Sequence, residues 1–321
     1  MFSRISQTVP LGPLSAIIAV FFFSLNDAAI KFLSGDYALH LIVLFRSLIG
    51  LAILLIVIVP FQGGLSVLRT KRLSMHLLRG LCVVVANTMF FLGLAVLPLA
   101  DAMAIFFVSP LLITAFSALL LGEHIGPRRM LAVSVGLLGV LVMIRPGADG
   151  FNTALLFPFA AAFAYAMLHV LTRKIGATES AATMSVYIQI VFILVSSLVG
   201  LTLGHGTFEG TGPEIFDFLL RPWHWPATGD YWILALLGVA SAMGGFFISQ
   251  AYRISEASLI APLEYVAMPM GVAFGVVIFG EWPSATTWIG IVLIIGSGLF
   301  VFWREADSSA NTGPDRPRTR R

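Results

Sequence analysis

The sequence predicts an all-α integral membrane protein of ten transmembrane helices, arranged as an inverted five-plus-five repeat. Three observations predict this fold class: a very apolar composition, ten apolar stretches of membrane-spanning length, and a phrase of sequence that occurs twice. Of the 321 residues, 58% are hydrophobic and 11% are charged, and the mean hydropathy is +0.96. A soluble domain of this composition would expose more apolar surface than one core can bury, so lipid is the expected solvent.

Ten stretches reach the length of about 17–25 mostly apolar residues that crossing a hydrocarbon core requires. The predicted spans are 14–33, 39–59, 77–97, 101–121, 130–145, 153–171, 183–203, 231–251, 258–279 and 286–303. The predicted organisation is a cytoplasmic N-terminal segment (1–13), a first repeat (14–145), a second repeat (146–303) with an outer loop (204–229), and a disordered cytoplasmic tail (304–321).

The basic residues predict the orientation of the helices. With the N-terminus in the cytoplasm, the inner loops hold most of the basic residues and the outer loops hold two, as the positive-inside rule requires. The inner set is Arg4, Arg69, Lys71, Arg72, Arg79, Arg128, Arg129, Arg173, Lys174, Arg253 and Arg304, and the outer set is Arg145 and Arg221. Both termini are therefore expected in the cytoplasm.

A phrase that begins with proline and ends in Gly-Glu occurs in both halves of the chain. The first copy spans 110–123 and precedes the apolar stretch 130–144, and the second spans 269–281 and precedes 288–303. Duplicated membrane units are typical of secondary transporters, whose substrate sites lie where the repeats meet. Because five is an odd number, the second unit enters the membrane from the opposite side, and the inverted repeat favours alternating access.

The Gly-Glu pairs have a structural explanation. Gly122 and Gly280 are predicted to end their helices in a left-handed conformation, which places Glu123 and Glu281 at the start of the next helix. A negative charge is favoured there. The proline of each copy is predicted to kink its helix.

Together these motifs resemble the EamA family of the drug/metabolite transporter superfamily, over nearly the whole chain (14–304). Pro110 precedes Glu123 by thirteen residues and Pro269 precedes Glu281 by twelve, and an arginine occurs early in the second span. The resemblance implies a bacterial inner-membrane transporter of small organic metabolites, such as amino acids, riboflavin or S-adenosylmethionine. It does not identify the substrate.

Ionisable residues inside the spans are the best functional candidates, because a charge in the membrane is costly unless it is paired or faces water. Asp27 and Arg46 reach a similar depth below the outer surface, so a buried ion pair is expected, beside Asn26 and extended by Lys31 one turn further on. The pair is either an outer gate or substrate anchor, or a permanent contact that fixes helix packing.

A second polar set is expected in the inner half. Glu264 of the ninth span and Gln189 of the seventh lie at comparable depths, and His169 lies near the inner end of the sixth. Glu264 is the candidate for proton coupling, because burial favours the protonated form of a carboxylate. The alternative is a structural residue that satisfies backbone groups of an irregular helix.

Aromatic residues near mid-span are candidates for a substrate cavity. Tyr165 and the polar Asn87 are the stronger choices, because each needs a hydrogen-bond partner in a dry interior, and Tyr265 is a further candidate. The phenylalanines Phe21, Phe22, Phe23, Phe90 and Phe91 and the tyrosine Tyr187 are alternatives that could equally pack or face lipid.

The predicted function is a proton-linked or facilitative carrier of a small organic metabolite across the inner membrane. Its partners are the substrate, the lipid bilayer and protons; the net charge of +3 comes from loops and tail and indicates no nucleic acid. A channel-like facilitator is the main alternative. An integral-membrane enzyme is less supported, because no HExxH zinc spacing or nucleotide loop occurs, and neither a cofactor nor a metal is predicted.

Overall fold

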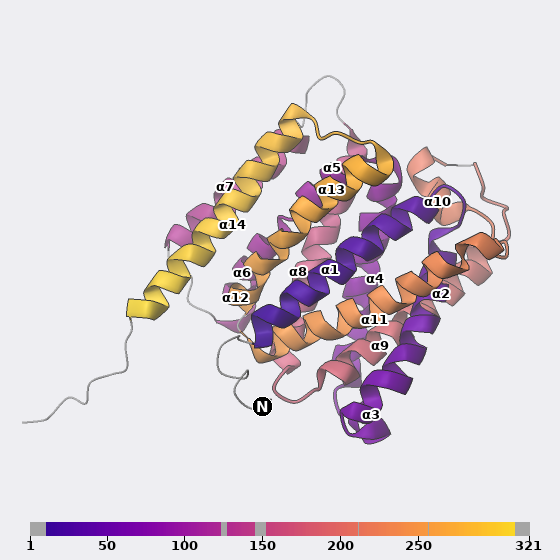
Figure 1. Cartoon of the computed structure of the whole chain (residues 1–321), viewed down its shortest axis with the longest axis horizontal. Coiled ribbons are helices and arrows are strands. Elements are labelled where there is room, and N and C mark those ends of the chain that lie inside the picture. The colour runs from indigo at the N-terminus through magenta and orange to yellow at the C-terminus, as the bar shows by residue number, and fades with distance from the viewer. Residues whose placement is uncertain (1–10, 123–126, 145–151, 211, 256, 312–321) are drawn as a thin grey trace, which may run out of the picture.

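The structure, a computed structural model, describes residues 11–122, 127–144, 152–210, 212–255 and 257–311 as helices joined by short connections (Figure 1). Within these ranges, seven helical segments are long and apolar enough to cross a membrane: Leu11–Leu33, Leu39–Phe61, Leu73–Val96, Leu99–Leu121, Thr153–Ile175, Ala181–Leu203 and Thr228–Ile254. Three shorter apolar stretches are Ser134–Met143, Leu263–Phe279 and Ala285–Ser297. The predicted all-helical membrane class is confirmed.

The α-helices are α1 (Leu11–Leu33), α2 (Leu39–Ile53), α3 (Val59–Phe61), α4 (Leu73–Val96), α5 (Leu99–Phe106), α6 (Ser109–Leu121), α7 (Pro127–Ile144), α8 (Leu156–Ile175), α9 (Ala181–Leu203), α10 (Asp217–Leu220), α11 (Tyr231–Ile254), α12 (Ala257–Ile260), α13 (Ala267–Phe279) and α14 (Ala285–Asn311). A π-helical turn, η2 (Leu54–Ile58), joins α2 to α3. The 3-10 helices are η3 (Gly64–Leu68), η4 (Thr153–Leu155), η5 (Glu214–Phe216), η6 (Thr228–Asp230) and η7 (Ala261–Val266).

Two of the membrane helices are interrupted shortly before a proline. α5 ends at Phe106, just before Pro110 of α6, and α12 passes through η7 into α13, which contains Pro269. Proline lacks the N–H that would bond to the carbonyl four residues earlier, which belongs to Phe106 in one copy and Tyr265 in the other. The irregularity expected at both prolines is confirmed.

The glycine of each Gly-Glu pair ends its helix as predicted. Gly122 has φ 72° and Gly280 has φ 66°, the left-handed conformation that stops a helix. The expectation for Glu281 is wrong, however: α14 begins only at Ala285, and the N–H of Glu281 turns back to the carbonyl of Gly275 at 2.9 Å. Its side chain is therefore free to bind another helix. Glu123 lies outside the described residues.

Helices of the first half pack against helices of the second. α1 lies along α11, α4 lies along α8, and α7 and α14 lie side by side at one edge of the bundle (Figure 1). Small residues permit this closeness: a Cβ atom at Gly244 of α11 would lie 2.8 Å from the ring of Phe23 in α1. The core of the bundle therefore lies between the halves rather than within either one.

The bundle has two ends, named here after their carboxylates. The connections 34–38, 97–98 and 280–284 and the loop 204–230 gather at the Glu281 end, and the connections 62–72 and 176–180 gather at the Glu179 end. α14 continues to Asn311, so residues 304–311 of the predicted disordered tail are helical. Arg304, Glu305 and Ala306 are good helix formers, which explains why the helix extends.

The closest crossing of α2 and α11 yields a stability prediction. A Cβ atom at Gly238 would lie 2.3 Å from Cγ2 of Ile49, whereas one at Gly245, on the same helix, meets nothing within 4 Å. We expect Gly238→Ala to lower the free energy of unfolding by about 1–3 kcal/mol through overpacking. Gly245→Ala should leave it unchanged or raise it by up to about 1 kcal/mol, because alanine is the better helix former. Thermal unfolding of the purified variants in detergent measures both changes in stability. Equal effects of the two substitutions would contradict the close contact between Gly238 and Ile49.

Candidate functional site

A cavity lies at the centre of the bundle, between helices of both halves. Its walls come from α1, α2, α4, α8, α9 and α11, with Phe106 at the end of α5. Six of the lining side chains are aromatic: Phe23, Phe90, Phe91, Phe106, Tyr165 and Phe192. Polar or charged side chains from all six helices lie among them, and such a mixture of aromatic surface and polar groups suits a small organic molecule.

Arg46 projects from α2 into the cavity and is held from two sides. Its Nη1 donates to Oδ1 of Asn26 in α1 at 3.0 Å, and its Nη2 donates to Oδ1 of Asn87 in α4 at 2.6 Å. The guanidinium also lies 4.9 Å from the ring centre of Phe192 and 5.7 Å from that of Phe91. The structure thus brings together three residues that were predicted as separate site candidates, Asn26, Arg46 and Asn87, and all three line the cavity.

The predicted ion pair between Asp27 and Arg46 is not formed. Asp27 lines the cavity and accepts a hydrogen bond from the side chain of Asn26 at 3.2 Å. The guanidinium of Arg46 donates to the side-chain oxygens of Asn26 and Asn87 instead. Consecutive helical residues point about 100° apart, so Asn26 rather than Asp27 faces Arg46 at the same depth. Lys31, expected to extend the pair, points to the Glu281 end.

At the Glu281 end, Lys31 binds the connections of two other helices. Its Nζ lies 2.9 Å from Oε1 of Glu281 and donates to the carbonyl of Leu97 at 2.7 Å. The other oxygen of Glu281 accepts from the N–H of Leu99 at the start of α5, at 2.9 Å. A carboxylate is favoured at a helix N-terminus, so this contact ties α1, α5 and the end of α13 together.

The loop 204–230 closes over the same end. The hydroxyl of Tyr37 donates to Asp230 at 2.5 Å, and Arg221 donates to the carbonyls of Ser34 and Tyr37 at 2.8 and 3.2 Å. Burial, and then the bond to Asp230, raise the pKa of Tyr37, so its hydroxyl stays a donor. Trp223 of this loop is half-buried and donates a hydrogen bond to His40.

Glu264 lies in η7 and is buried with a relative exposure of 4%. Its carboxylate accepts from the hydroxyl of Tyr165 in α8 at 2.9 Å and from that of Tyr252 in α11. The ring of His169 lies between the two tyrosines, with centroid distances of 4.2 and 4.1 Å. Tyr165 and His169 line the cavity, so Glu264 contacts it through a tyrosine hydroxyl.

The remaining predicted residues divide between the cavity and the core. Gln189 lines the cavity and donates to Ser241 of α11 at 2.9 Å, so it does not join Glu264 directly. Tyr265 is absent from the described cavity lining: it is 3% exposed and its ring lies 6.0 Å from that of Phe107. Tyr265 is therefore a core residue rather than a cavity residue.

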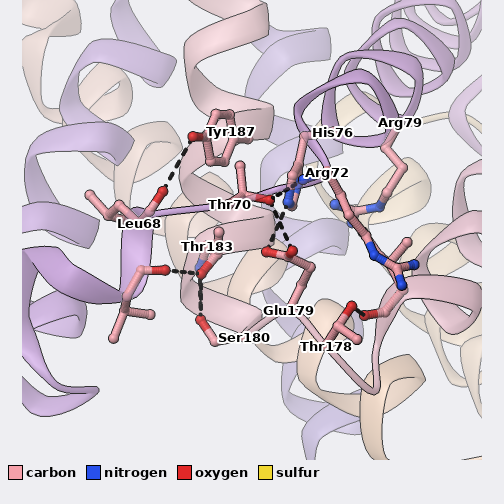
Figure 2. A network of polar contacts seen from close by, with 12 residues as sticks. Leu68, Thr70, Arg72, His76, Arg79, Thr178, Glu179, Ser180, Thr183 and Tyr187 are labelled. Atoms are coloured by element: carbon pink, nitrogen blue, oxygen red, sulfur yellow. Dashed lines mark hydrogen bonds and ion pairs between the residues drawn. The ribbon is translucent and has the colours of Figure 1, made fainter.

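At the Glu179 end a polar network joins the two halves (Figure 2). The carboxylate of Glu179 accepts from Thr70 at 2.9 Å and lies 3.1 Å from Nε2 of His76, and its backbone carbonyl accepts from Nε of Arg253 at 3.0 Å. Thr183 donates to the carbonyl of Val67 at 2.7 Å. Sequence reasoning missed this network, because depth along a helix identifies neither loop partners nor facing sides.

Arg79 is the cavity residue that the sequence placed wrongly. It was expected in an inner loop, but α4 begins at Leu73 and buries Arg79 to 1% exposure in the cavity wall. Its spacing gives a signal that could have found it. Arg79, Val83, Asn87 and Phe90 recur at intervals of three or four residues and so share one face of α4. In the described part of the chain, no group of three His, Cys, Asp or Glu residues could hold a metal ion.

Two segments of the sequence, 10–145 and 152–303, match the model of the EamA-like transporter family. The chain belongs to this family. EamA-like proteins are transporters rather than enzymes, so an enzymatic role is set aside. The repeated phrase lies at corresponding places in the two matched segments.

Relatives of this EamA-like protein carry different cargoes. It is 30% identical to a riboflavin transporter of Vibrio cholerae over 82% of this chain and 84% of that one. It is 28% identical to an S-adenosylmethionine uptake transporter of Rickettsia prowazekii (90% and 91% covered) and 29% identical to a pseudopaline exporter of Pseudomonas aeruginosa (88% and 93%). A solved crystal structure matches with a TM-score of 0.68 at 21% identity, covering 92% of this chain and 98% of that one, which shows the same fold.

The Lys31–Glu281 contact yields a coupling prediction. The side chains are 10% and 27% exposed, so removing one charge leaves the other largely buried. We expect Lys31→Met and Glu281→Gln each to lower the melting temperature, and the double variant to recover part of the loss. The expected coupling energy is about 1–2 kcal/mol. Thermal unfolding measures it, with exposed Lys71→Met as the control; additive single effects would show that the contact contributes nothing.

Proposed function

We propose that this EamA-like protein is a secondary transporter that moves a small organic metabolite across a bacterial inner membrane by alternating access. The observation that carries the proposal is the central aromatic cavity, which lies between the two family-matched segments and has polar contacts at both of its ends. A carrier needs such a site between two closures, and only one closure opens at a time.

The proposal includes ten transmembrane helices in an inverted five-plus-five repeat. The seven long segments and three shorter apolar stretches add to ten, and α7 and α14 would be the fifth and tenth spans. Inversion exchanges the first span with the sixth and the third with the eighth. The packing of α1 on α11 is then the symmetry mate of the packing of α4 on α8, and both contacts are extensive. Both termini would face the cytoplasm, with the Glu281 end outside.

The proposed substrate is a small polar or aromatic metabolite, with riboflavin, S-adenosylmethionine and amino-acid-like compounds as candidates. Six aromatic rings supply stacking surfaces, and Arg46, Asn26, Asp27, Asn87 and Gln189 supply polar contacts. The relatives named above carry riboflavin, S-adenosylmethionine and pseudopaline. Both uptake and export occur among them, so the direction follows from the gradients rather than from the fold.

Glu264 is the proposed proton carrier. Its carboxylate is buried, and its two hydroxyl partners are neutral, so in the described surroundings no cation lies within ion-pair distance of it. A carboxylate in such surroundings exchanges a proton when the cavity admits water. The alternative is a purely structural role, in which Glu264 only forms the two hydrogen bonds that tie η7 to α8 and α11.

Flux through purified protein in proteoliposomes tests this function. Labelled riboflavin, S-adenosylmethionine, tryptophan and alanine would be offered with and without a pH gradient. We expect saturable flux of one compound, accelerated by the gradient. Arg46→Ala should reduce the flux about tenfold or more, because a charge-assisted contact is lost. Glu209→Gln, on the exposed loop, is the control.

A counterflow experiment distinguishes proton coupling from transport of the substrate itself. Glu264→Gln should abolish the response to the pH gradient and keep the exchange of labelled for unlabelled substrate, because exchange needs no net proton movement. A variant that still responds to the gradient would remove Glu264 from coupling. Flux that does not saturate and shows no counterflow would favour the channel-like alternative.

A further inference from the structure

Arg79 differs from every other charged residue of the cavity in what it binds. Its Nε donates to Oγ1 of Thr172 in α8 at 2.9 Å, and the side chain lines the cavity at the end nearer Glu179. Its Nη1 is fully buried and has no hydrogen-bond partner among the described residues. Figure 2 shows Arg79 beside the Glu179 network with no dashed contact to the residues drawn there.

Arg79 also has no carboxylate at ion-pair distance among the described residues. Glu179 is the nearby carboxylate, but it binds Thr70 and His76, and within the described ranges no carboxylate forms an ion pair with Arg79. Arg46, by contrast, has both terminal nitrogens bonded to asparagine oxygens. A buried guanidinium with an unbonded nitrogen and no carboxylate in direct contact is costly in a folded protein, and a negative oxygen of a ligand would supply the missing contact.

Three neighbouring side chains share this incomplete bonding. Oγ of Ser185, Oε1 of Gln189 and both ring nitrogens of His169 are buried without a partner among the described residues, and all three residues line the cavity. Ser185 and Gln189 are four residues apart on α9, so they present one face. Ser and His can each donate a hydrogen bond to a negative oxygen, and Gln189 can accept one from a polar group nearby.

We propose that Arg79, with Ser185 and His169, binds an anionic oxygen group of the transported metabolite, a carboxylate or a phosphate. The proposal rests on the proposed function and names its substrate class: a small metabolite with an anionic group at one end and an apolar or aromatic body. Asn87 lies eight residues after Arg79 on α4, about 12 Å along the helix, so such a body would extend toward Arg46. S-adenosylmethionine and amino-acid-like compounds fit this class, and riboflavin, which has no anionic group, does not.

Matched aromatic probes test the anionic group without knowledge of the natural substrate. Benzoate, phenyl phosphate and benzamide would be titrated into the purified full-length protein at constant ionic strength, with thermal stabilisation as the readout. We expect benzoate, phenyl phosphate or both to stabilise the protein with at least about tenfold higher affinity than benzamide. The preferred probe identifies the group. Equal affinities for all three, or no stabilisation by either anion, would overturn the proposal.

Variants then assign the preference to Arg79. Arg79→Gln should abolish the difference between anion and amide, and Arg79→Lys should keep part of it, since the charge remains. Arg69→Gln, in an exposed connection, is the control. A preference that survives in Arg79→Gln would overturn the assignment.

A ligand-free measurement distinguishes binding from a structural role. Arg46→Met removes both bonds to Asn26 and Asn87 and should lower the melting temperature. Arg79→Met removes one bond, to Thr172, together with a buried charge that has no carboxylate in direct contact, and should leave the melting temperature unchanged or raise it. An equal fall in both variants would show that Arg79 only supports the fold. Failure of every metabolite to cross proteoliposomes would count against the transporter proposal alone, and saturable transport of riboflavin that is insensitive to Arg79→Gln would count against Arg79 alone.

Discussion

The need to satisfy every buried polar group inside an apolar bundle is the constraint on which this structure depends. Lipid offers no hydrogen bonds, so each polar side chain must find its partner on another helix or in a cavity. Arg46 joins α2 to α1 and α4, and Glu264 joins η7 to α8 and α11. These contacts are few and each spans different helices. They therefore fix how the helices face one another, and the central cavity is the space that remains between them.

The same constraint makes the two ends of the bundle comparable. At one end Lys31 of the first half meets Glu281 of the second, and at the other Thr70 and His76 of the first half meet Glu179 of the second. Any movement of one half against the other must break one of these sets. The Lys31–Glu281 contact is partly exposed and His76 and Glu179 are buried, and individual contacts of these kinds contribute about 1–3 kcal/mol. States that differ by a few such contacts can interconvert, as alternating access requires.

Sequence reasoning predicted the features that depend on composition or on one residue. The helical membrane class, the breaks at Pro110 and Pro269 and the left-handed glycines all follow from local chemistry. Depth along a helix placed Arg46 level with Asp27, and Asn87 was a separate candidate because its amide needs a hydrogen-bond partner. The sequence does not show which side of a helix faces its neighbour, so Asp27 rather than Asn26 was predicted to bind Arg46. Loop partners such as Glu179 were missed, because they depend on how separate helices meet in three dimensions.

The contrast between Arg46 and Arg79 shows how one scaffold can serve different cargoes. Both terminal nitrogens of Arg46 are bonded to asparagine oxygens, so this residue ties α2 to α1 and α4 as well as lining the cavity. Arg79 keeps a nitrogen unbonded, so on the proposed mechanism its partner arrives with the substrate. Relatives at 28–30% identity carry chemically different molecules. If hydrogen bonds between helices fix the bundle, substrate specificity can change through the cavity side chains that have no protein partner. The helix packing need not change with them.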